Sequence, residues 1–218
     1  SRQSRLHHAH SNPSLLRMND TFTLFGLVDT SALELASFAL ALCMVLLNIR
    51  QSPWAWLFSI LSAAMYAVVF YDSKIYGDMS LQFFFIAVSL WGWYQWLFGG
   101  ATHQGVQVSR MPPRAYLYSG LAWLIGFIAI AAFLRMFTDT DVPHIDAFLT
   151  AGSLVGQILL SRKKLENWYV WIAIDLIYIG LYLHKDLYLT AFLFAIFVVL
   201  AVIGLRTWDK SLRAQGQA

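Results

Sequence analysis

Residues Leu187–Leu205 read LYLTAFLFAIFVVLAVIGL and contain no Asp, Glu, Lys or Arg. A helix needs about 20 mostly apolar residues to cross the hydrocarbon core of a bilayer. The rest of the chain has the same character, because hydrophobic residues make up 59% and charged residues only 12% of its 218 positions. A soluble protein carries roughly 25% charged residues. The sequence therefore predicts a membrane protein and excludes a soluble fold.

Six further stretches resemble Leu187–Leu205 closely enough to be predicted as membrane-spanning helices. Only helices and closed barrels satisfy the backbone hydrogen bonds inside a bilayer. The predicted fold class is therefore an all-α membrane protein with seven transmembrane helices. The seven predicted spans are Ser31–Ile49, Pro53–Tyr71, Met79–Phe98, Ala115–Leu134, Ile145–Ser161, Asn167–Leu183 and Leu187–Leu205.

An internal repeat appears when the chain is aligned with itself at an offset of 112 residues. The first three predicted helices then align with the last three without a gap, and the fourth remains as a linker. Both units enter the membrane in the same direction, so we expect two parallel three-helix repeats joined by a linker helix (3+1+3). Transporters use such repeats and bind substrate between them near the midplane. The aligned pairs are Glu34 and Asp146, Arg50 and Arg162, Trp56 and Trp168, Tyr66 and Tyr178, Tyr76 and Tyr188, Gly92 and Gly204, and Trp96 and Trp208.

The predicted organisation has five segments. Their boundaries follow from the apolar spans, from the Gly- and Pro-containing joint after residue 98 and from the 112-residue offset. They are a disordered leader or expression remnant at 1–29, a first three-helix repeat at 30–98, a loop and linker helix at 99–144, a second three-helix repeat at 145–210 and a cytoplasmic tail at 211–218.

Basic residues predict the orientation of the chain, since Lys and Arg gather on the cytoplasmic side. Alternate connections place nine Lys and Arg on the side of the C-terminus and six on the other. We therefore expect a multi-pass protein of the cell inner membrane, with its N-terminus outside and its C-terminus in the cytoplasm. Basic residues occur singly between apolar runs, which argues against nucleic-acid binding.

A stripe of five residues on the sixth predicted helix marks a candidate substrate site. Their spacings of 3, 4, 3 and 4 place them within an arc of roughly 80° on one helix face. A carboxylate near mid-span is costly and is by default a functional-site hypothesis. The stripe consists of Trp168, Trp171, Asp175, Tyr178 and Tyr182.

Five residues on other helices complete the predicted substrate site. The repeat places Trp56 and Tyr66 opposite the stripe, while Gln82, Trp93 and Gln157 add an aromatic ring and two amides. Other roles stay open at this point. The tryptophans also suit an aromatic belt at the membrane interface, Asp175 suits a packing hydrogen bond in its protonated form, and the glutamines can link helices.

The chemistry of this set favours a flat, cationic ligand, since aromatic faces and a carboxylate both attract positive charge. An enzyme is not expected, because no phosphate-binding loop and no nucleophile with its base occur within the spans. The lone Cys43 excludes an intrachain disulfide and a cysteine-rich metal site. No cofactor and no metal are predicted.

Three motifs resemble those of PnuC-type vitamin transporters, which are best known for nicotinamide riboside, an NAD precursor. The motifs are Trp91-Gly-Trp-Tyr-Gln-Trp96, Asn167-Trp-Tyr-Val-Trp171 followed by Asp175, and Lys185-Asp-Leu-Tyr-Leu-Thr190. The resemblance covers about residues 30–210. It implies a SWEET-like fold, a homotrimer, and facilitated diffusion with trapping by a cytoplasmic kinase. It also places the family's Trp-x-x-Trp motif on Trp168 and Trp171.

Several alternatives remain open on sequence grounds. The same family contains thiamine and riboflavin carriers, and a site that favours a cation disfavours only riboflavin, which is not a cation. A SWEET-like sugar pore would need neutral polar groups at the position of Asp175. A receptor or scaffold that does not transport is the remaining class.

Overall fold

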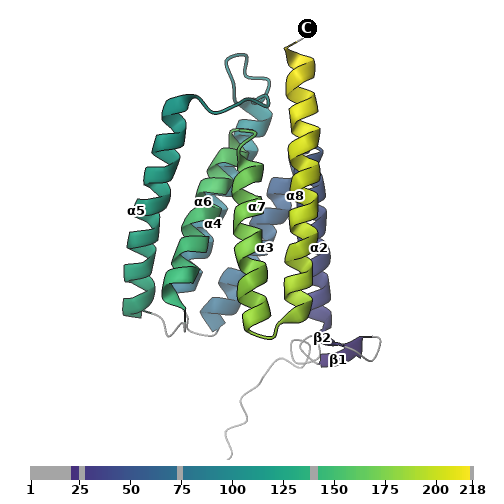
Figure 1. The fold of residues 1–218 in the computed structure, drawn as a ribbon, viewed down its shortest axis with the longest axis vertical. Coiled ribbons are helices and arrows are strands. Elements are labelled where there is room, and N and C mark those ends of the chain that lie inside the picture. The colour runs from purple at the N-terminus through teal and green to yellow at the C-terminus, as the bar shows by residue number, and fades with distance from the viewer. Residues whose placement is uncertain (1–20, 25–27, 73–75, 138–141, 217–218) are drawn as a thin grey trace, which may run out of the picture. The chain divides into compact units, whose positions relative to one another are not determined.

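The computed structural model describes residues 21–24, 28–72, 76–137 and 142–216. Within them the chain forms seven helices (Figure 1), which confirms the predicted number. The helices are α2 (Ala32–Ile49), α3 (Trp54–Asp72), α4 (Tyr76–Phe98), α5 (Pro113–Phe137), α6 (Pro143–Ser161), α7 (Asn167–His184) and α8 (Tyr188–Gln215).

Two short strands precede the helices. The chain divides into two compact units, residues 1–41 and 42–218. In the first unit, β1 (Thr21–Leu24) pairs antiparallel with β2 (Val28–Ser31). The sequence predicts a disordered leader over residues 1–29. The structure differs from this prediction where β1 and the start of β2 form. The strands form because they contain threonine, valine and phenylalanine, which favour extended chains. The residues before 21 lie outside the described part.

In the second unit, neighbouring helices in the chain pack against one another. The closest pairs are α3 with α4, α5 with α6, and α7 with α8, while α6 also packs against both α4 and α7. Figure 1 shows α5, α6, α7 and α8 side by side with their axes in roughly the same direction. Hence α6 contacts both α4 and α7, two of the helices that carry the predicted site.

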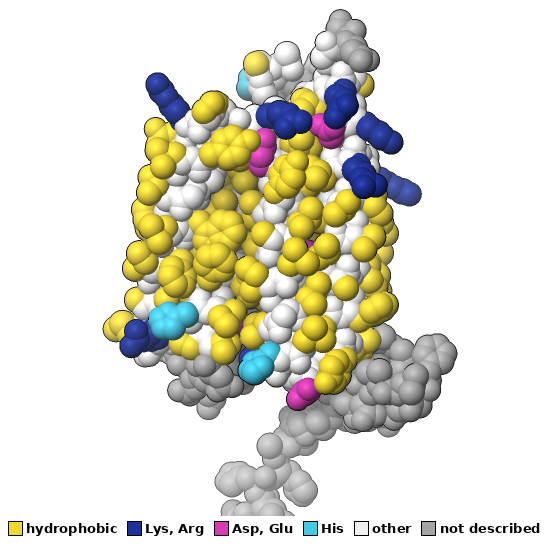
Figure 2. All heavy atoms as spheres, in the orientation of Figure 1, with side chains coloured by type: hydrophobic (Ala, Val, Ile, Leu, Met, Phe, Trp, Pro, Cys, Tyr) yellow, Lys and Arg dark blue, Asp and Glu magenta, His cyan; other side chains and the backbone are white. Residues whose placement is uncertain are grey.

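Apolar side chains cover the outside of the helices. Two described helices, α5 and α8, are long and apolar enough by length and composition to cross a membrane, and only 11% and 17% of their apolar windows are buried. Shorter apolar helices run over Phe38–Ile49 and Trp54–Met65. On α5, the side chains of Leu117, Ile125 and Ile128 are all exposed. Figure 2 shows hydrophobic side chains over the flank of the helices, the surface that a bilayer would cover.

Basic side chains gather at one end of the second unit, which we call the basic end (Figure 2). It comprises the turn between α6 and α7, the loop before α5 and the C-terminal part of α8 (Figure 1). The largest buried cluster of the described residues lies at this end and draws on the loop before α5, the α6–α7 turn and every helix of the bundle except α5. Its members are Ile49, Trp56, Trp96, Val108, Leu160, Leu165, Trp168, Ala201 and Trp208.

The same turn occurs twice at the offset of 112 residues, once between α2 and α3 and once between α6 and α7. Gln51 and Lys163 both adopt left-handed backbone conformations, with φ of 55° and 48°. Their backbone hydrogen bonds also correspond. They are Gln51 N to Asn48 O at 3.0 Å and Ser52 N to Leu47 O at 2.9 Å, against Lys163 N to Leu160 O at 2.9 Å and Lys164 N to Leu159 O at 2.9 Å.

Candidate functional site

Asp175 is a buried carboxylate on α7. Its residue is 7% exposed, and no hydrogen bond or ion pair joins it to another described residue. A buried charge without a partner is costly. Asp175 therefore offers a carboxylate, without a partner among the described residues, that a positively charged ligand can bind.

An aromatic group follows Asp175 along the same helix. The rings of Tyr178 and Tyr182 are stacked, with centroids 5.7 Å apart and planes at 14°. Phe194 of α8 touches both, at centroid distances of 4.7 Å and 5.2 Å. The structure thus brings the two predicted tyrosines together. Sequence reasoning missed Phe194, because α8 is apolar on every side and nothing in its pattern marks the face turned to α7.

Trp168 lies in the packed interior, 3% exposed. Its ring lies edge-on to Trp208, with centroids 5.4 Å apart, and a Cβ placed on Gly204 would come within 2.6 Å of it. The indole Nε1 of Trp168 is buried and has no hydrogen-bond partner among the described residues. Trp168 therefore fills the core and leaves one donor unused, three residues before Trp171.

Trp56 repeats this environment at the equivalent position of α3. It is 1% exposed, lies edge-on to Trp96 at 5.5 Å, and faces Gly92, where a Cβ would come within 2.5 Å of the ring. Its Nε1 also lacks a partner among the described residues. Trp56 and Trp168, which are equivalent at the 112-residue offset, are thus packed in the same way.

Trp171 and Gln157 lie where α6 and α7 meet. A Cβ on Gly156 would come within 3.2 Å of the Trp171 ring, so this ring lies against α6 next to Gln157. Both Trp171 and Gln157 are half-buried. Partial exposure leaves each of them surface for a ligand, unlike Trp168.

Gln82 and Trp93 lie on α4, which packs against α3 and α6. Gln82 is half-buried, and Trp93 contacts Trp54 at a centroid distance of 6.4 Å. No hydrogen bond or ring contact joins these two residues to the α7 stripe within the described chain, but Trp93 packs against the buried cluster that contains Trp168. The side chain of Tyr66 lies outside the described residues.

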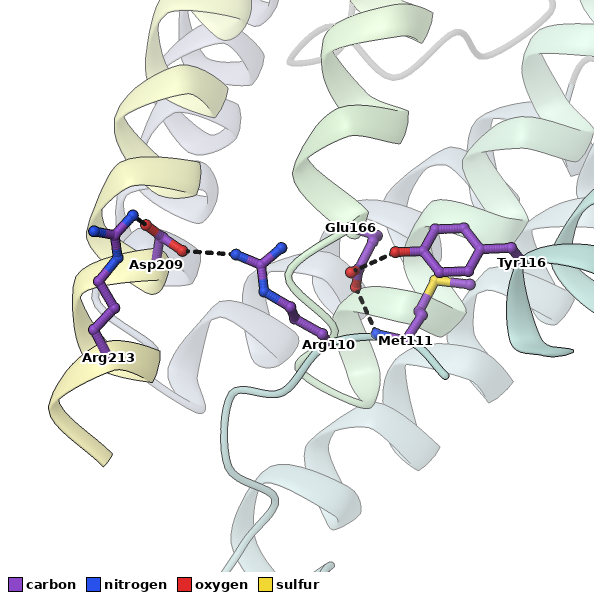
Figure 3. A network of polar contacts seen from close by, with 6 residues as sticks. All are labelled: Arg110, Met111, Tyr116, Glu166, Asp209 and Arg213. Atoms are coloured by element: carbon purple, nitrogen blue, oxygen red, sulfur yellow. Dashed lines mark hydrogen bonds and ion pairs between the residues drawn. The ribbon is translucent and has the colours of Figure 1, made fainter. Parts of the chain in front are cut away.

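A polar network at the basic end was not predicted from the sequence (Figure 3). The buried carboxylate of Glu166 accepts hydrogen bonds from Met111 N at 3.0 Å and from the Tyr116 hydroxyl at 2.9 Å. Asp209 of α8 forms ion pairs with Arg110 at 3.0 Å and Arg213 at 2.7 Å. These contacts attach the loop before α5 to α7 and α8.

Lys163, in the α6–α7 turn, is also largely buried, at 8% exposed. Burial lowers the pKa of its ammonium group. The Nζ atom lies 4.8 Å from the centroid of the Trp96 ring, and such a contact with an aromatic face favours the charged form. Lys163 thus belongs to the tryptophan-rich core. Among the described residues, no group of three or more His, Cys, Asp or Glu is arranged to hold a metal ion.

Comparison with known proteins relates this architecture to vitamin transporters. The model of the nicotinamide mononucleotide transporter family matches residues 31–210. The nicotinamide riboside transporter PnuC of Escherichia coli is 24% identical, over 88% of this chain and 90% of its own. The riboflavin/roseoflavin transporter RibM of Streptomyces davaonensis is 26% identical, over 78% and 80%. The crystal structure of the vitamin B3 transporter PnuC has a similar fold, with a TM-score of 0.62 and 22% identity over 81% of this chain and 80% of that one.

Proposed function

The chain belongs to the nicotinamide mononucleotide transporter family, and we propose that it carries nicotinamide riboside across the cell inner membrane by facilitated diffusion. It is a membrane transporter of a small molecule and not an enzyme, as its family and relatives are. Trapping of the product by cytoplasmic phosphorylation and a homotrimeric state belong to the same proposal. Both rest on the family resemblance.

The observation that carries the choice of substrate is the buried carboxylate of Asp175, which has no hydrogen-bond or ion-pair partner among the described residues. The nicotinamide ring of the riboside is a flat pyridinium cation. A carboxylate in a medium of low dielectric constant stabilises such a cation, and the nearby aromatic rings of Trp171 and Tyr178 add to the attraction. The amides of Gln82 and Gln157 are assigned to the ribose hydroxyls and the carboxamide.

The proposed architecture is two parallel three-helix repeats, α2–α4 and α6–α8, with α5 as the linker. Two equivalences support it. The turns at Gln51 and Lys163 have the same left-handed residue and the same hydrogen bonds. The pairs of Trp56 with Gly92 and Trp168 with Gly204 make the same close contact. We place the basic end in the cytoplasm and the N-terminus outside, on the basis of the Lys and Arg distribution.

Riboflavin is a second candidate, because the relative RibM is a riboflavin/roseoflavin transporter. Riboflavin is uncharged at neutral pH, so it would leave Asp175 unpaired in the bound state. Thiamine is a cation and fits Asp175 as well as nicotinamide riboside does. The receptor or scaffold class has no support from the family or its relatives.

Equilibrium binding to the purified protein separates these candidates. We expect nicotinamide riboside to bind most tightly among nicotinamide riboside, thiamine, riboflavin and glucose. Tighter binding of riboflavin would assign the chain to the RibM-like function, and tighter binding of thiamine would keep the cation site but change its ligand. Glucose serves as the neutral control.

A further inference from the structure

Two tryptophans at the basic end donate hydrogen bonds in a reciprocal pattern. Trp96 Nε1 of α4 donates to the carbonyl oxygen of Leu160 in α6 at 3.1 Å. Trp208 Nε1 of α8 donates to the carbonyl oxygens of Asn48 and Ile49 in α2, both at 3.2 Å. Trp96 and Trp208 are equivalent at the 112-residue offset, and so are Asn48 and Leu160. Each three-helix segment thus donates one indole N–H to the last turn of the other segment's first helix.

Burial and ring contacts make this pair the centre of the junction. Trp96 is 4% exposed and Trp208 is fully buried, and their ring centroids lie 6.1 Å apart. Trp56 lies edge-on to Trp96, and Trp168 lies edge-on to Trp208. Four rings therefore form a continuous layer that crosses from one segment to the other.

Further contacts join the two segments at the same end. Gln51 Nε2 donates to Ser211 Oγ at 3.4 Å, and the ammonium of Lys163 lies over the ring of Trp96. The guanidinium of Arg162 lies 5.4 Å from the ring centroid of Trp91. In this structure, the segments are therefore closed against each other at the basic end.

The acceptors in these bonds are suited to being released. The carbonyl oxygens of Asn48 and Leu160 also accept a backbone hydrogen bond, from Gln51 N and Lys163 N, so each keeps one partner when the indole bond breaks. Water can replace the indole N–H there if the basic end opens, so each bond costs only the modest net value of an ordinary hydrogen bond. If the two segments are related by an axis along the membrane normal, separating them at one end breaks both bonds together.

We propose that Trp96 and Trp208 are positioning residues for transport, whose reciprocal hydrogen bonds hold the basic end closed and break when substrate leaves on that side. The proposal rests on the two-repeat transporter architecture described above, but not on the identity of the vitamin. In this proposal the tryptophans form a gate, whose contacts break in each transport cycle, and not a hinge, whose contacts persist.

Thiol labelling measures the opening without any substrate. The parent protein carries Cys43→Ser and Ser161→Cys; Ser161 is fully buried and follows Leu160 at the basic end. A charged, membrane-impermeant thiol reagent is applied to the purified protein, and the rate of modification is recorded. Trp96→Phe and Trp208→Phe each remove one N–H and keep an aromatic ring. We expect each to raise the rate about fivefold, the factor equivalent to one ordinary hydrogen bond, and the double variant to raise it further.

The matched control is Trp54→Phe, which alters an exposed tryptophan at the start of α3 and should leave the rate unchanged. Elution volume and helix content identify any variant that fails to fold. Labelling at the parental rate in folded Trp96→Phe and Trp208→Phe proteins would overturn the proposal.

A cross-link distinguishes a gate from a hinge and does not require the tryptophan variants. Cysteines at Gln51 and Ser211, whose side chains meet across the junction, are joined by a short, reducible thiol cross-linker in the Cys43→Ser background. We expect uptake of the vitamin that the unlinked protein carries to stop on cross-linking and to recover on reduction. Undiminished uptake by the cross-linked protein would show that the basic end does not open. A different vitamin would change the proposed function but not this result.

Discussion

Asp175 is the residue on which the choice of a cationic substrate depends. Asp175→Asn keeps the size and hydrogen-bonding capacity of the side chain and removes its charge. Loss of a charge-assisted contact costs about 1.5–3 kcal/mol, so we expect nicotinamide riboside to bind roughly 10- to 150-fold more weakly.

The uncharged reduced riboside, with a dihydropyridine ring, is the control ligand for Asp175→Asn. It should bind the variant almost as well as the unchanged protein, as measured by calorimetric titration. Equal losses for both ligands would instead assign Asp175 to helix packing. Unchanged binding of both would place the carboxylate outside the site.

Trp168 and Trp171 are expected to differ, although the sequence predicts them as one aromatic pair. Trp171 is half-buried, so Trp171→Ala should weaken substrate binding by about 1–2 kcal/mol, the scale of a desolvated cation–π contact. Trp168 is 3% exposed in the core, so Trp168→Ala should lower the free energy of unfolding by about 3–5 kcal/mol. Ligand titration and thermal unfolding separate the two effects; a Trp171→Ala protein that binds normally would make Trp171 an interfacial residue.

At the scale of helices, glycine permits the close contact of α4 with α3 and of α8 with α7. A Cβ would lie 2.5 Å from Trp56 at Gly92 and 2.6 Å from Trp168 at Gly204. We expect Gly92→Ala and Gly204→Ala each to destabilise the protein by about 1–3 kcal/mol through overpacking. The measurement is the midpoint of thermal unfolding in detergent.

Gly180 of α7 is the matched control for these substitutions, because a Cβ there meets nothing within 4 Å. Alanine favours helix over glycine by about 1 kcal/mol, so Gly180→Ala should leave the midpoint unchanged or raise it. A fall as large as that of Gly204→Ala would show that helix packing is not the cause.

Helix ends show what the sequence pattern can and cannot predict. The seven helices follow from their apolar runs, but α8 continues to Gln215, ten residues beyond the predicted end at Leu205. Hydropathy marks the edge of the apolar stretch, whereas a helix continues into water when its residues favour it. The strands β1 and β2 were missed because four-residue segments give no clear periodic signal.

Helical spacing predicted only part of the candidate site. Helical spacing placed Asp175, Tyr178 and Tyr182 on one face, and the structure stacks the two tyrosines. Spacing does not reveal which neighbour covers a face, so it did not separate the core position of Trp168 from the partly open one of Trp171. Glu166 was also missed, because its partners lie more than 45 residues away in the chain.

At the scale of the whole molecule, we propose a carrier that opens alternately on its two sides and moves its substrate passively. Asp175 is the buried carboxylate of the described spans, and no ion pair joins it to a Lys, Arg or His among the described residues, so we expect no coupling to a proton or sodium gradient. Transport should therefore depend only on the gradient of the substrate.

Uptake of labelled nicotinamide riboside into sealed vesicles that contain the purified protein tests this account most directly. The vesicles carry no ion gradient and no phosphorylating enzyme, and empty vesicles serve as the control. We predict protein-dependent uptake that stops when the internal and external concentrations are equal. Accumulation above the external concentration under an imposed proton or sodium gradient, or no uptake beyond that of empty vesicles, would contradict it.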